Sequence, residues 1–135
     1  MSKDKNVKTQ ELLGELLTNR EIDRLGEGFH ENVVDHDPAP DAPAGIAGIK
    51  QFWSTFFTAF PDAALEVETL VADEDQVTAV FTITGTNTGP FQGNEPTGKS
   101  FKVRGIQVGR FDEEGLLVER WGSTDEAGML QQIGA

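Results

Sequence analysis

The chain has 135 residues, the length of one domain, and 37% of its residues are hydrophobic, with nine Phe and two Trp, which is enough for a single buried core. It contains no Cys, and this excludes disulfides, thiolate metal sites and cysteine nucleophiles. Its formal net charge of −12 argues against nucleic acid and anionic lipid as partners, because phosphate groups are bound by clustered Lys and Arg.

No stretch of the chain approaches the roughly 18 consecutive apolar residues that a membrane-spanning helix needs. The N-terminus after Met1 is polar and charged, and no apolar stretch follows it, unlike a secretory signal. We therefore expect a cytoplasmic protein that does not associate with membranes.

Two helices are predicted before residue 36. Residues 9–17 carry Leu in the i, i+1, i+4, i+5 spacing of a short amphipathic helix. Thr18 and Glu21 then fit a capping box, with a hydroxyl at the cap and a carboxylate three residues later. The second helix, which starts there, is expected to end by Val34 or Asp35. Its apolar face would consist of Ile22, Leu25, Phe29 and Val33.

A third helix is predicted after a loop. Residues 37–44 contain three Pro within six positions, so they form a loop. The helix that follows ends at Pro61, because Pro cannot continue it. Its wide apolar stripe consists of Ile46, Ile49, Phe52, Trp53, Phe56, Phe57 and Phe60.

From residue 64 onward the apolar period changes to two, which predicts strands. Alternating segments cover residues 65–71, 77–84, 101–111 and 116–125, with turns at 73–75 and 112–115 and a short closing helical turn near Met129. Three helices followed by four sequential strands predict one α+β domain over residues 1–135. We expect a cone: a curved antiparallel sheet, covered on its concave face by the three N-terminal helices and enclosing an apolar pocket.

Asp125 is the main catalytic candidate. It follows the last predicted strand, which is apolar and contains Trp121. Burial raises the pKa of a carboxyl group, so that it can hold or take a proton near neutral pH. We therefore expect Asp125 to be buried beside the pocket as an acid/base, with Trp121 on the same strand face. Core packing alone would also explain Trp121.

Other candidates would line the pocket and bind substrate. Trp53 and Phe57 come from the third helix, and His36 begins an extended segment. Asn87 is a polar residue on an otherwise apolar strand face, and it could equally face a substrate or satisfy the protein's own backbone. Gln107 shares its strand face with apolar residues and is also a pocket candidate.

Two motifs are interpreted as non-functional. Residues 93–100 match the phosphate-binding pattern G-x-x-x-x-G-K-S, but a strand pattern follows where that loop needs a helix, and Pro96 removes one N–H. Asp35-His36-Asp37 resembles a metal-ligand cluster, but His30 and His36 would be about 240° apart on a helix. We expect no cofactor and no metal.

Several motifs together resemble the SnoaL-like polyketide cyclases over residues 10–134. They are Phe60-Pro61-Asp62, Gly85-Thr-Asn-Thr-Gly89, Gly93 with Pro96-Thr97-Gly98-Lys99, Glu114-Gly115, Val34-Asp-His36-Asp-Pro38 followed by Gly45 and Gly48, and Trp121 with Asp125. The resemblance implies the nuclear-transport-factor-2-like cone. It also implies a cofactor-free intramolecular aldol cyclisation, with an aspartate at the position of Asp125 as acid/base.

Three hypotheses for function follow. The first is an aldol-type cyclase or related proton-transfer enzyme acting on a small apolar or aromatic carbonyl compound, with Asn87 and Gln107 bonding the enolate-like oxygen. The second is a non-catalytic small-molecule binder on the same fold. The third is a hydrolase like limonene epoxide hydrolase, in which an aspartate activates water. An exposed Asp125 would remove both enzymatic hypotheses.

A homodimer or higher homo-oligomer is also expected. The strand over residues 101–111 is apolar on both faces, with Val103 on one and Ile106 on the other. Helices can cover only one side of the sheet, and exposed apolar sheet surface usually marks an interface.

Overall fold

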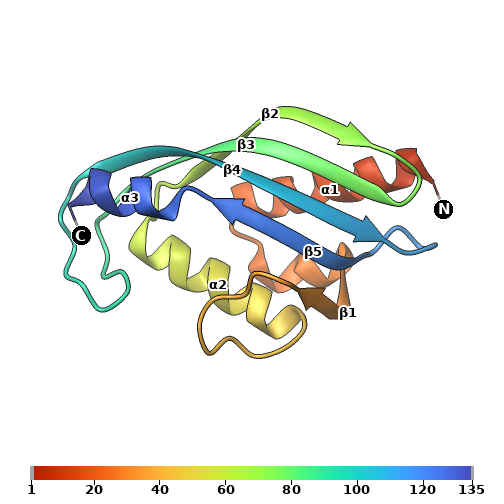
Figure 1. The fold of residues 1–135 in the computed structure, drawn as a ribbon. Coiled ribbons are helices and arrows are strands. Elements are labelled where there is room, and N and C mark those ends of the chain that lie inside the picture. Colours follow the sequence, from red (N-terminus) through yellow and green to blue (C-terminus); the bar gives the residue numbers. More distant parts are fainter. Residues whose placement is uncertain (1, 135) are drawn as a thin grey trace.

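The computed structural model describes residues 2–134 (Figure 1). Its elements are α1 (Lys3–Thr18), the 3-10 helix η1 (Ile22–Glu27), β1 (Phe29–Asp35), α2 (Ile46–Ala59), β2 (Ala64–Ala72), β3 (Gln76–Thr86), β4 (Ser100–Phe111), β5 (Leu117–Thr124) and α3 (Glu126–Ile133). The five strands form one sheet in the order β1-β5-β4-β3-β2, with β1 parallel to β5 and all other pairs antiparallel. The chain therefore has the predicted α+β fold, with a curved sheet that does not close on itself.

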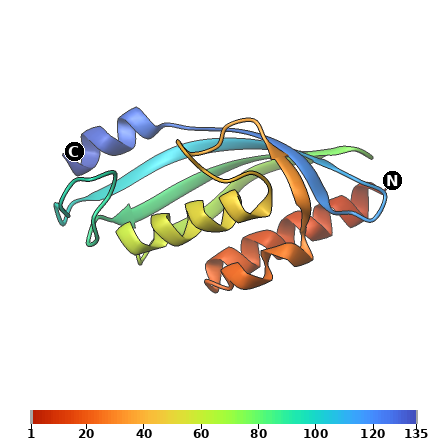
Figure 2. The same cartoon turned by 90° about the horizontal axis from the view of Figure 1, so that it is seen from below.

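Helices α1 and α2 cover the concave face of the sheet (Figure 2). The apolar stripe predicted for the third helix faces the sheet in part: the ring of Phe56 packs edge-on against Phe101 of β4, whereas Phe52 is exposed. Other buried core residues are Leu13, Leu16, Leu25, Phe60, Val77, Phe111, Leu117 and Ile133. Within residues 2–134 no helix is both long enough and apolar enough to cross a membrane.

The second predicted helix is wrong beyond Glu27, because the segment that follows is strand β1. Phe29 and Val33 are buried as predicted, but on a strand that lies parallel to β5. Their separation of four residues fits two strand repeats as well as one helical turn, so the pattern was ambiguous. The capping box is also absent: Thr18 ends α1, and its hydroxyl donates to the Gly14 carbonyl.

A bulge in β5 changes which side chains face the helices. Leu117 pairs with Phe111, but Glu119 pairs with Arg110, so Val118 is an extra residue on β5. Beyond it the concave face carries Arg120, Gly122 and Thr124, and the convex face carries Glu119, Trp121 and Ser123. Trp121 was expected to face the pocket, on the concave side, and this is therefore wrong.

Helix α3 continues along β4 where β5 ends. The backbone N–H of Asp125 still donates to the Arg104 carbonyl, as a strand residue would. In the last turn of α3, the Gln132 amide bonds both the N–H and the C=O of Lys102. On the edge of β4 that β5 no longer covers, the side chain of Gln132 thus takes the place of a neighbouring strand.

Candidate functional site

The concave face keeps one solvent-accessible strip, which we call the open strip. Its residues are Phe81, Gln107, Arg120, Gly122 and Thr124, all at least partly exposed. Cross-strand register places them side by side, because Phe81 pairs with Gly105, Gly105 with Thr124, and Gln107 with Gly122. On the same face the surrounding residues Val77, Ala79, Ile83, Phe101, Val103, Phe111 and Leu117 are buried. The strip is thus bordered by apolar core.

Arg120 is the charged group of the open strip. Its Nε donates to Gln107 Oε1 at 3.0 Å, and its Nη1 donates to Asp35 Oδ1 at 2.5 Å. The side chains of Arg120 and Asp35 are only 18% and 17% exposed. A charge-assisted pair in this partly desolvated setting is stronger than one on the surface.

Two polar atoms of this group remain available. Arg120 Nη2 and Asp35 Oδ2 make no hydrogen bond with any residue from 2 to 134. A donor nitrogen and an acceptor oxygen of one ion pair are therefore free to meet a ligand.

Gly122 makes room for the guanidinium. A β-carbon at this position would overlap Nη2 of Arg120, so any residue larger than Gly would displace the guanidinium. The Gly122 N–H donates to Asp37 Oδ2 at 2.8 Å, which anchors the chain just after β1. The carboxylate of Asp35 thus pairs with Arg120, and that of Asp37 accepts a hydrogen bond from the β5 backbone. Across residues 2–134 no group of three or more His, Asp or Glu residues is arranged to hold a metal ion.

The aromatic residues of α2 lie partly as expected. Trp53 is half-buried and stacks on Phe57, while Phe57 is buried under the guanidinium of Arg20, whose Cζ is 3.8 Å from the ring centroid. Phe57 thus packs in the core, and with Arg20 and Ile22 of η1 it also lines an open surface depression. Phe52 is exposed and stacks on Phe56, so rings extend from the sheet to the surface.

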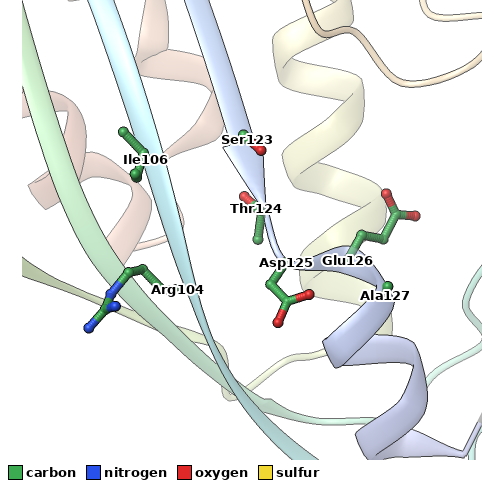
Figure 3. Close-up of a pocket in the computed structure, with 7 residues that line it drawn as sticks. All are labelled: Arg104, Ile106, Ser123, Thr124, Asp125, Glu126 and Ala127. Atoms are coloured by element: carbon green, nitrogen blue, oxygen red, sulfur yellow. The ribbon is translucent and has the colours of Figure 1, made fainter.

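Asp125 is exposed, contrary to the expectation that it is buried. Strand β5 ends at Thr124, so Asp125 becomes the N-cap of α3, and its Oδ1 accepts a hydrogen bond from Gly128 N at 2.9 Å. It borders an open depression of about 500 Å³ at the junction of β5 and α3 (Figure 3). The lining residues are Arg104, Ile106, Ser123, Thr124, Asp125, Glu126 and Ala127. This exposure removes the apolar setting on which the acid/base role of Asp125 depended.

His36 and Trp121 lie together on the convex face. Their rings stack with centroids 4.8 Å apart, and His36 Nε2 is 2.6 Å from Glu119 Oε2. Glu119 also accepts a hydrogen bond from Arg110 at 2.8 Å. The sheet separates this group from Gln107, so the structure does not bring the expected pocket residues into one site.

Asn87 is buried and bonded entirely within the chain. Its Nδ2 donates to the Gly89 carbonyl at 2.8 Å, and its Oδ1 accepts from Thr97 N at 2.9 Å. Of the two alternatives, a substrate-facing amide or a structural amide, these bonds favour the structural one. They hold the two ends of the loop after β3 together.

Gln107 lies on the concave face as expected, but its partners Arg120 and Asp35 were not predicted. Arg120 was missed because strict alternation from Leu117 assigns it to the convex face. The sequence does contain a sign of the bulge, because the three consecutive apolar residues 116–118 break the alternation. Asp35 was missed because its segment was interpreted as a helix end.

The family model for SnoaL-like polyketide cyclases matches residues 7–133. No curated protein sequence matches the chain. Among solved structures, TsrD from Streptomyces laurentii is 22% identical with a TM-score of 0.89, over 100% of this chain and 98% of that one. IdmH from Streptomyces antibioticus, described as a candidate polyketide cyclase, is 27% identical with a TM-score of 0.82, over 96% and 99%. AclR from Streptomyces galilaeus, described as a candidate hydroxylase, is 24% identical with a TM-score of 0.85, over 98% of each chain.

Proposed function

The chain belongs to the SnoaL-like polyketide cyclase family, and from this premise we propose that it acts on a small apolar carbonyl compound. The reaction would be an aldol-type cyclisation or a related proton transfer that uses no cofactor. The compound would lie along the open strip, where polar groups are bordered by apolar core. The fold alone does not select this chemistry, because similar folds serve different reactions.

The observation that carries the proposal is the free Oδ2 of Asp35 beside the guanidinium of Arg120. A carboxylate oxygen without a partner can accept a proton from a carbon next to a carbonyl group. Arg120, held at Nε and Nη1, would fix the carboxylate so that this oxygen faces the strip. Asp35 is therefore the acid/base candidate that the geometry favours.

The exposure of Asp125 removes the enzymatic hypotheses that relied on this residue, although the family resemblance points to it. An acid/base role for Asp125 would require a change at the start of α3, because its carboxylate caps that helix and faces solvent. The two aspartates make different predictions, so the proposal can be tested without knowing the natural substrate.

The test follows deuterium incorporation at carbon 1 of 2-tetralone, a neutral aromatic ketone, in D₂O by proton NMR. The wild-type protein should accelerate this exchange. Asp35→Asn keeps an oxygen for Arg120 but is a far weaker base, so it should slow exchange by roughly 10²–10⁴-fold. Asp125→Asn should leave exchange unchanged if Asp35 is the base. The opposite pattern would assign the reaction to Asp125, and no acceleration by the wild type would contradict proton transfer.

A second candidate function is non-catalytic binding of the same class of compound. The exposure of Asp125 and its use as a helix cap favour this alternative. In the same experiment a pure binder would shift and broaden the 2-tetralone resonances without deuterium incorporation. A hydrolase at Asp125 has less support, because within residues 2–134 its carboxylate bonds only to Gly128 N.

A further inference from the structure

We propose that Arg120 is the residue that selects the ligand, by donating a hydrogen bond from Nη2 to a neutral carbonyl oxygen. This inference rests on the proposed function, since it places the ligand on the open strip, but it concerns binding and not the proton transfer. It assigns a role to a residue that the family resemblance did not single out.

The guanidinium is pre-oriented for this role. Two of its nitrogens are fixed by acceptors on different strands, Gln107 on β4 and Asp35 on β1, so the planar group can rotate little. A donor whose orientation is fixed before binding loses less conformational entropy when the ligand arrives. The third nitrogen, Nη2, is the only one of the guanidinium that makes no hydrogen bond with residues 2–134. Gln107 and Asp35 act here as positioning residues.

Gly122 also contributes to the position of the Arg120 guanidinium. Because it has no side chain, Nη2 can lie directly over its α-carbon on the concave face. The guanidinium therefore occupies the space that a side chain at position 122 would take. The pairing of Gln107 with Gly122 across β4 and β5 keeps both groups in one row.

Local charge favours a neutral ligand over an anion. The charges of Arg120 and Asp35 offset each other in the ion pair, and Asp37 adds a further carboxylate at the Gly122 N–H. The region thus has a net negative charge, within a chain whose formal net charge is −12. A ligand carboxylate would be repelled, whereas a carbonyl oxygen needs only one donor. If negative charge develops on that oxygen during a reaction, the same donor would stabilise it.

The experiment compares three ligands of one shape by calorimetry: 2-tetralone, tetralin, which lacks the carbonyl, and tetralin-2-carboxylate. In the wild type 2-tetralone should bind at least about tenfold more tightly than either of the others, as expected for a hydrogen bond from a charged donor. Arg120→Gln should remove this preference and leave tetralin binding unchanged. Arg110→Gln on the convex face is the matched control and should retain it.

Gly122→Ala tests the geometry without removing any charge. Its β-carbon should displace Nη2, so the preference for 2-tetralone should fall while the ion-pairing residues remain. Gly14→Ala is the control, because a β-carbon there meets nothing within 4 Å. Thermal unfolding of each variant shows whether it is folded.

The inference is overturned if the wild type shows no preference for the ketone, if it prefers the carboxylate, if it binds none of the three, or if Arg120→Gln keeps the preference. These outcomes are distinct from failure of the proposed function. A preference that depends on Arg120 without deuterium exchange would support this inference and contradict the enzyme. If Arg120→Gln still catalyses deuterium exchange and binds the ketone as tightly as the wild type, the enzyme is supported and the role of Arg120 is contradicted.

Discussion

The imidazole of His36 lies almost parallel to the indole of Trp121, with an angle of 6° between the ring planes. The stack joins the segment after β1 to β5 on the convex face of the sheet. Its polar edge is Glu119, which contacts both His36 and Arg110. The hydrogen bond from His36 and, next, that from Arg110 lower the pKa of the Glu119 carboxyl below its usual range.

This shift predicts a loss of stability in acid. A carboxyl group whose pKa is lower in the folded than in the unfolded state stabilises the fold above its unfolded pKa, about 4.3 for Glu. That contribution disappears as the pH falls through the folded pKa. Urea unfolding between about pH 5 and pH 3 should therefore depend less on pH in Glu119→Gln than in the wild type. Glu66→Gln, on the same face and without an ion pair in residues 2–134, should behave like the wild type.

Asp125 should contribute to stability as a helix cap. Asp125→Ala removes the acceptor for Gly128 N and should lower the free energy of unfolding by about 1 kcal/mol. Asp125→Asn keeps an oxygen at the cap and should stay close to the wild type. Urea unfolding at neutral pH measures both. Equal stability of all three proteins would show that the cap bond is not formed in solution.

Asn87 should be among the most sensitive polar positions. Asn87→Ala leaves the Gly89 carbonyl and the Thr97 N–H without their partner at a residue that is only 2% exposed. The Gly89 carbonyl is buried, and an unsatisfied buried polar group costs about 1–3 kcal/mol, so a loss of that size is expected on urea unfolding. Asn94→Ala in the exposed part of the same loop is the control. A small effect at Asn87 would mean that water replaces its bonds.

The sequence predicted those parts of the fold where one periodicity is long and uninterrupted. The stripe from Ile46 to Phe60 could only be a helix, and the alternation over β4 placed Gln107 correctly. Prediction failed where two periods share a spacing, as for Phe29 and Val33, which fit a helix or a strand. It failed again at Val118, because one inserted residue exchanges the faces of all later side chains. The concave group of Arg120 and Asp35 depends on both features, so alternation alone could not find it.

The loop that matches the phosphate-binding pattern should not bind ATP. Ser100 begins strand β4, so no helix N-terminus lies behind the loop, and the Gly98 N–H already donates to the Asn87 carbonyl. Calorimetry with ATP and magnesium should show no binding at micromolar protein. Magnesium-dependent micromolar affinity would contradict this prediction.

The convex face should join two copies of the chain. Ile106 is 44% exposed and Val71 68% exposed on this face, and apolar surface of this kind is stabilised when a partner covers it. Arg104 and Arg110 on the same face already pair within the chain, with Glu68 and Glu119. The apolar centre is therefore the part of the face that gains most from a partner, and a two-fold arrangement is the simplest way to cover it.

Light scattering at low micromolar concentration should give at least twice the 14.7 kDa mass of the chain. Ile106→Lys places a charge in the apolar centre and should shift the protein toward the monomer, because the lysine would have to be desolvated without a partner. Thr55→Lys, exposed on α2 on the other side of the sheet, should leave the mass unchanged. A wild-type monomer would show that the convex face stays in contact with water, and an Ile106→Lys protein of unchanged mass would place the interface elsewhere.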